Sequence, residues 1–113
     1  MGAGNSPLSA ESICGTGAVG LVAVGTTAAT ALQLSAVNNT ITTSAASTGV
    51  KLSPTEVGAQ VIVRNDSGQT VTIYPYDTNS TIHAGATSVT VATAKTILLA
   101  ATSATTWVSI TGA

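Results

Sequence analysis

The sequence predicts an all-β fold: a small antiparallel β-sandwich or jelly roll of about eight short strands, preceded by an extended N-terminal arm. Short runs rich in Val, Ile and Thr follow one another closely, separated by the turn formers Gly, Asn, Asp and Ser. Within the clearest runs, residues 61–64 and 88–91, apolar and polar side chains alternate as in a half-buried strand. The Ala-rich stretch 26–36 leaves a short helix as the weaker alternative, because Thr is a poor helix former.

The arm comprises residues 1–17 and the β-domain residues 18–113. Gly, Ser and Ala dominate the arm, so it has little apolar surface with which to pack onto the domain. Leu8 and Ile13 are its candidate interface residues, since each can insert into a groove of a neighbouring subunit. We expect the arm to become ordered only when bound, and its deletion to weaken attachment while leaving the β-domain folded.

The β-domain contains a series of candidate strands, of which two are expected to form a hairpin. Residues 61–64 and 70–74 alternate and are joined by Asn65-Asp66-Ser67-Gly68, while Pro75 ends the second strand. No long internal repeat is present, which argues against a β-solenoid. The candidate strands are Val19–Val24, Thr30–Leu34, Thr40–Thr43, Gly49–Leu52, Gln60–Arg64, Thr70–Tyr74, Ser88–Ala92, Lys95–Leu99 and Thr106–Ile110.

The apolar residues predict a thin core. Phe is absent, and the aromatic residues are Tyr74, Tyr76 and Trp107, so Val, Ile and Leu must supply most of the interior. Trp107 lies in the last candidate strand, and we expect it to be largely buried, either in the core or as a hot spot of a subunit contact.

The low charge of the chain indicates self-association. Charged residues make up 6% of the sequence, against about 25% in ordinary soluble domains, and Ser and Thr replace them. A hydroxyl-rich β surface is covered by another subunit without desolvating charges. A secreted β-domain without a partner is the alternative.

Several classes of partner and compartment are disfavoured. There is no basic cluster for nucleic acid or for an anionic membrane, and no apolar run of about 20 residues to span a bilayer. Residues 18–24 are apolar but too short, and they lack the cationic start of a signal peptide, so we expect synthesis and use without export. The single Cys14 excludes an internal disulfide framework.

The sequence predicts no enzyme, no cofactor and no metal site. Residues 15–20 match GxGxxG, but neither a preceding strand nor a later acidic residue supports a dinucleotide site. His83 is the only His, and a surface or interface position explains it better than a catalytic triad. A weak calcium site is the most that two residue pairs can offer, Asn65 with Asp66 or Asp77 with Asn79. The presence of these residues is better explained by their preference for turns.

The most distinctive local string is Tyr74-Pro75-Tyr76-Asp77. Tyrosines beside an acid bind sugars by stacking and hydrogen bonding, and they are also frequent at protein interfaces. Interface or core packing is the favoured interpretation of Tyr74 and Tyr76, and sugar contact is the alternative.

From about residue 26 onward the chain resembles short virion proteins of tailed bacteriophages, of the capsid decoration (cement) or small head or tail fibre module type. The strings that carry the resemblance are Ala31-Leu32-Gln33-Leu34, Asn39-Thr40-Ile41-Thr42-Thr43, Thr48-Gly49-Val50-Lys51-Leu52, Val61-Ile62-Val63-Arg64-Asn65, Val71-Thr72-Ile73-Tyr74-Pro75, Thr81-Ile82 and Val91-Ala92, with Lys95 and Trp107.

The resemblance implies a homotrimeric β-fold with a structural role in the virion, and no catalytic residue comes with it. The expected function is that of a decoration protein, made in the host cytoplasm, that binds the outside of a phage head and stabilises contacts between major capsid proteins. The alternative is a fibre or tail module that binds a receptor or glycan through Tyr74 and Tyr76.

Overall fold

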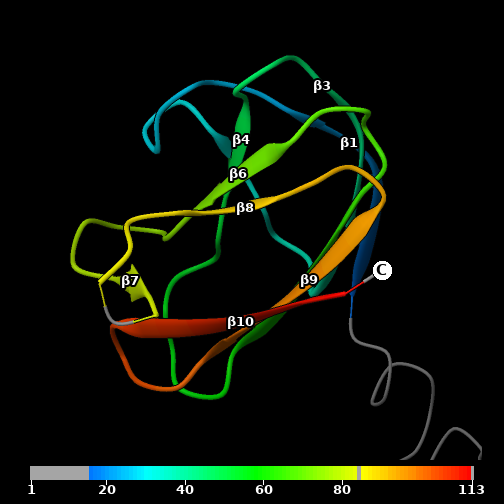
Figure 1. Cartoon of the computed structure of the whole chain (residues 1–113). Coiled ribbons are helices and arrows are strands. Elements are labelled where there is room, and N and C mark those ends of the chain that lie inside the picture. Colours follow the sequence, from blue (N-terminus) through cyan, green and yellow to red (C-terminus); the bar gives the residue numbers. More distant parts are fainter. Residues whose placement is uncertain (1–15, 84, 113) are drawn as a thin grey trace, which may run out of the picture.

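A computed structural model describes residues 16–83 and 85–112, and within these the protein is all-β, with ten strands in two sheets and no helix (Figure 1). The six-stranded sheet has the order β1-β3-β5-β9-β10-β7, and the four-stranded sheet the order β2-β4-β6-β8. The bounds are β1 Gly17–Ala23, β2 Leu32–Gln33, β3 Asn38–Ser44, β4 Gly49–Lys51, β5 Gln60–Asn65, β6 Val71–Tyr74, β7 Thr81–Ile82, β8 Val89–Val91, β9 Lys95–Ala101 and β10 Thr106–Gly112. These bounds confirm the predicted all-β class, and each candidate strand overlaps an observed one.

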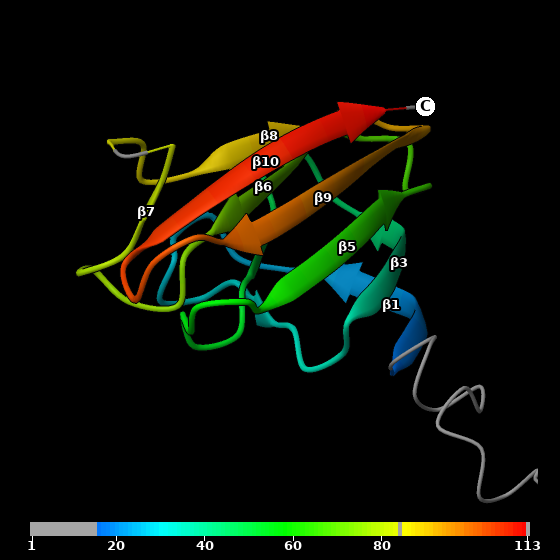
Figure 2. The same cartoon turned by 90° about the horizontal axis from the view of Figure 1, so that it is seen from below.

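The first six strands follow a β-solenoid-like path. The chain passes from one sheet to the other at every step, so β1, β3 and β5 align in parallel in one sheet and β2, β4 and β6 in the other. Three of the remaining strands add antiparallel pairs, β8 on β6, β9 on β5 and β10 on β9, while the short β7 pairs in parallel with β10. Figure 2 shows the resulting two layers, with β5, β9 and β10 in one and β6 and β8 in the other.

The predicted antiparallel pairing is therefore wrong for the first half of the chain. The lack of an internal sequence repeat does not exclude a solenoid-like path, because the turns of the coil are unequal. Asn38 lies opposite Gly17 on one side and Ile62 on the other, so successive turns contain different numbers of residues. A repeat of fixed period is then absent from the sequence even though the strands stack.

The predicted hairpin is also wrong, because β5 and β6 lie in different sheets. Asn65 is the physical reason. Its buried amide Nδ2 donates to the carbonyl oxygens of Gln69, at 2.7 Å, and Val91, at 2.9 Å, and its Oδ1 accepts from Ser67 N at 3.0 Å. These bonds fix a loop that carries the chain across to the second sheet rather than back along the first.

One core fills the space between the sheets, as the sequence predicts, with Trp107 as its largest side chain. The sequence missed β7, whose Ile82 is fully buried opposite Trp107, because two residues are too few to show alternation. The largest fully buried side chains are Trp107, Ile41, Leu52, Ile73, Ile82, Ile97 and Leu99. Among the described residues, no helix is long and apolar enough to cross a membrane.

Candidate functional site

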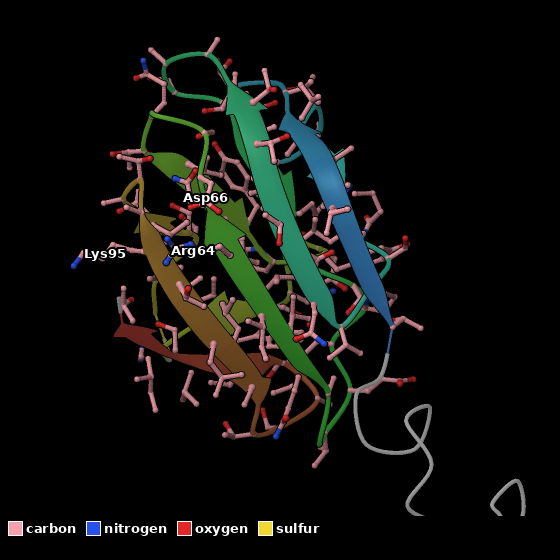
Figure 3. All side chains as sticks on the ribbon, turned by 90° about the vertical axis from the view of Figure 1, so that its right-hand side faces the viewer. Arg64, Asp66 and Lys95 are labelled. Carbon is pink, nitrogen blue, oxygen red and sulfur yellow. The ribbon has the colours of Figure 1, made fainter. Side chains whose placement is uncertain are left out.

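Two surfaces of the β-domain are candidates for function, one on each sheet. The first is the outer face of the six-stranded sheet, which Figure 3 views. Because Val61 and Val63 point into the core, the alternate residues Ile62 and Arg64 point outward, and the same alternation applies to β9 and β10.

An apolar row crosses this outer face. Ile62 on β5 lies opposite Leu98 on β9, which in turn lies opposite Ile110 on β10. Ile110 is 71% exposed, and Val108, on the same face of β10, is exposed as well. Side chains that lie directly opposite one another on one sheet face form a continuous patch. This aliphatic patch, hereafter the apolar row, consists of Ile62, Leu98, Val108 and Ile110.

Charges are confined to one end of the face, where β5 and β9 lie side by side. Arg64 Nε donates to Asp66 Oδ1 at 2.8 Å, the single ion pair among the described residues, and Lys95 lies nearby (Figure 3). Both partners are well exposed, so the pair contributes at most about 1 kcal/mol. The apolar row itself carries no charge.

The second candidate is a cavity of about 310 Å³ on the four-stranded sheet, hereafter the Tyr76 pocket. It combines apolar walls with hydroxyls, one cation and one carboxylate. A larger hollow of about 440 Å³ has no aromatic or charged residue in its lining, so it offers fewer groups for recognition. The Tyr76 pocket is lined by Ala28, Ala29, Lys51, Pro75, Tyr76, Asp77, Thr78, Ser80 and Thr87.

The wall formed by Ala28 and Ala29 is held in place by hydrogen bonds. Tyr74 on β6 donates from its hydroxyl to the carbonyl oxygen of Thr26 at 3.1 Å, which ties the loop before β2 to the sheet. Within the loop, the Thr27 and Thr30 hydroxyls are 2.9 Å apart, and Thr30 N donates to Thr27 O at 3.1 Å. The loop is therefore anchored on both sides of the two alanines.

The charged groups of the pocket are oriented by their neighbours. Lys51 Nζ lies 5.6 Å from the centroid of the Tyr76 ring, within the range of a cation–π contact. Asp77 Oδ1 accepts from the backbone N–H of Asn79 at 3.1 Å, which forms an Asx turn. Tyr76 remains 43% exposed, so part of its ring is open to a ligand.

The structure separates the predicted interface residues. Leu8 and Ile13 lie outside the described residues, as does the arm apart from residues 16 and 17, and β1 begins at Gly17. Trp107 was expected in the core or at an interface, and it is fully buried within the chain. Of these two alternatives the core position applies, because no surface of Trp107 is left for a partner.

Tyr74 and Tyr76 were predicted as a pair, but they differ in position. Tyr76 lines the pocket, whereas Tyr74 is half-buried and braces the pocket wall. The residues that the sequence analysis missed are Lys51 in the pocket and the four side chains of the apolar row. Periodicity could have identified Ile62, which alternates with the buried Val61 and Val63, but not its contact with Leu98, which depends on strand order.

The described residues form neither a hydrogen-bonded catalytic triad nor a cluster of metal ligands. His83 is exposed, as predicted, and its Nε2 lies 2.7 Å from Ser109 Oγ, but no described acidic side chain hydrogen-bonds to the ring as the orienting member of a triad. Asn65 uses its amide within the loop, so it has little capacity to ligate calcium. Groups of three potential metal ligands are absent from the described residues. Residues 17–20 belong to strand β1, so they do not form a phosphate-binding turn before a helix.

Comparison of the chain with protein-family models, with curated protein sequences and with solved structures gives no significant match.

Proposed function

We propose that this chain is a structural protein that self-associates as a homotrimer through the outer face of the six-stranded sheet. The observation that carries the proposal is the apolar row, which crosses three neighbouring strands and contains the 71%-exposed Ile110. Contiguous exposed apolar patches mark sites at which another protein or another subunit binds.

Copies of the chain are suitable partners for this face. The net charge is −1, so copies repel one another only weakly. Around the apolar row, the outward-facing residues of β3 and β9 include Thr40, Thr42 and Thr96, whose hydroxyls can pair across a contact without the cost of desolvating an ion. In a trimer with threefold symmetry, each modest contact between two copies is made three times.

The role we propose for the trimer is that of a capsid decoration protein on the surface of a phage head, in contact with the major capsid protein. This part rests on the resemblance of residues 26–107 to virion proteins of that type. Many weak contacts, each worth about 25 cal/mol per Å² of apolar area, would add up through avidity to hold neighbouring capsid subunits together. The arm with Leu8 and Ile13 is the proposed attachment segment.

Replacing Ile110 by Lys is expected to abolish trimer formation at micromolar concentration. The substitution places a charge at the most exposed position of the apolar row, and a hot-spot change of this kind weakens association by roughly 30-fold or more. Sedimentation velocity of the wild type should give a trimer and of the Ile110→Lys variant a monomer.

Val57→Lys is the matched control, because Val57 is also 71% exposed but lies in the turn before β5 and is not one of the four residues of the apolar row. This control should remain trimeric. A wild-type monomer, or equal dissociation of both variants, would contradict the assignment of this face. The copy number in purified particles tests the particle role, since hundreds of copies indicate cement and a few indicate a tail or fibre module.

A further inference from the structure

We propose that the Tyr76 pocket binds one pyranose ring of a neutral glycan. This goes beyond the structural role and is independent of it, because the pocket lies on the four-stranded sheet and the proposed trimer contact on the six-stranded one. The two proposals can therefore fail separately.

The size of the pocket suits a single sugar ring. Its volume of about 310 Å³ lies at the lower end of the range of about 300–1,000 Å³ that is usual for small-ligand sites. The walls of Ala28, Ala29 and Pro75 have short side chains, so they shape the cavity without filling it. The partly exposed Tyr76 ring supplies the flat apolar surface on which the C–H face of a pyranose stacks.

The polar groups of the pocket favour a ligand that carries hydroxyl groups over a ligand that carries a net charge. Lys51 and Asp77 both line the pocket, and their opposite charges cancel, so the pocket has no net charge with which to select a charged ligand. No ion pair joins the two among the described residues, where Arg64 and Asp66 form the only one. A sugar hydroxyl can accept a hydrogen bond from an ammonium group and donate one to a carboxylate, so adjacent hydroxyls satisfy both side chains.

The pocket is also organised before binding. Lys51 lies over the Tyr76 ring, Asp77 is held in an Asx turn, and Tyr74 fixes the loop that carries the alanine wall. Ser80, which is 4% exposed, is held by a hydrogen bond of 2.8 Å between its hydroxyl and that of Thr55. A ligand therefore has few groups to order when it binds, which favours affinity.

The test is titration of the full-length ¹⁵N-labelled protein with glucose, galactose and mannose, each used as the free monosaccharide, followed by amide chemical shifts. We expect at least one sugar to shift the amides of residues 76–80 and 28–29, saturating with a millimolar dissociation constant. Tyr76→Ala should weaken binding at least 10-fold, and Tyr76→Phe should stay within about 3-fold of the wild type, since the ring alone provides the stacking surface. Asp77→Asn should weaken binding, and Val57→Ala should leave it unchanged.

Three results would overturn the proposal. The first is the absence of saturable shifts with all three monosaccharides. The second is unchanged binding by a Tyr76→Ala variant whose spectrum remains that of a folded protein. The third is saturable binding of free leucine at the same amides without any response to sugars, because that would identify the pocket as a site for a zwitterion, with Lys51 on its carboxylate and Asp77 on its ammonium group.

Discussion

Replacing Trp107 by Ala is expected to lower the free energy of unfolding by about 3–5 kcal/mol, a large part of the roughly 5–15 kcal/mol that stabilises a domain. Trp107 is fully buried on β10 and is the largest side chain in a core otherwise built of Ile, Leu, Val and Ala. Its Nε1 donates to Thr55 Oγ1 at 2.9 Å, and Thr55 Oγ1 lies 2.8 Å from Ser80 Oγ. The substitution therefore leaves a cavity and also releases two hydroxyls that connect the final strand to two loops.

Denaturant unfolding followed by circular dichroism measures the effect, at two protein concentrations. A core Trp destabilises the variant equally at both, whereas a Trp at a subunit contact would show a loss that depends on concentration. Trp107→Phe retains most of the volume and loses the hydrogen bond, so it should cost about 1–2 kcal/mol. If wild-type Trp fluorescence has the emission maximum of a solvent-exposed indole, the assignment of Trp107 to the core is refuted.

Replacing Asn65 by Ala is expected to cost about 2–4 kcal/mol, which is unusual for a residue in an Asn-Asp-Ser-Gly string. Asn65 is fully buried, and its amide bonds to Ser67, Gln69 and Val91. Truncation leaves the buried Val91 carbonyl without its donor, and an unsatisfied buried group costs about 1–3 kcal/mol. Ser67→Ala removes a more exposed partner of the same amide and should cost less, so it serves as the comparison in thermal unfolding.

Asn65→Asp adds a dependence on pH. The introduced carboxylate would place an oxygen, in place of a donor, against the carbonyl oxygens of Gln69 and Val91. Burial without a cation raises the pKa of a carboxyl above its unfolded value, so the folded form is favoured only when the group is protonated. The loss of stability relative to wild type should therefore be largest near neutral pH and become smaller as the pH falls through the raised folded pKa towards the unfolded pKa. A loss that is independent of pH would show that the Asn65 amide site is open to water.

The sequence was sufficient to locate every strand except β7, but it did not show which strands pair with one another. Alternation around Val61 and Val89 locates strands because one face of each is buried. Pairing depends on contacts between residues far apart in the chain, and local pattern carries little information about them. Asn65 illustrates the limit: as a turn former it predicts a hairpin, but its buried amide stabilises a crossing between sheets.

The same limit applies to the candidate surfaces. Tyr76 was identified because Tyr and Asp are conspicuous in a chain with 3% aromatic and 6% charged residues. Lys51 was missed as a pocket residue because it comes from a different strand, β4, which lies beside β6 only in the folded chain. The apolar row likewise combines β5, β9 and β10, whose adjacency the sequence does not show.

The alternation of the chain between two sheets has a kinetic consequence. Each parallel ladder from β1 to β6 joins strands that are separated by a strand of the other sheet, so every one closes a long loop before it gains its contacts. In the described part of the chain, β9 and β10 are the single pair of consecutive strands that hydrogen-bond to each other. Non-local topologies of this kind fold in roughly milliseconds to seconds. The β9–β10 hairpin, which is synthesised after the coil of β1 to β6, therefore has the smallest loop-closure cost. The larger sheet is complete only after β9 has paired with β5.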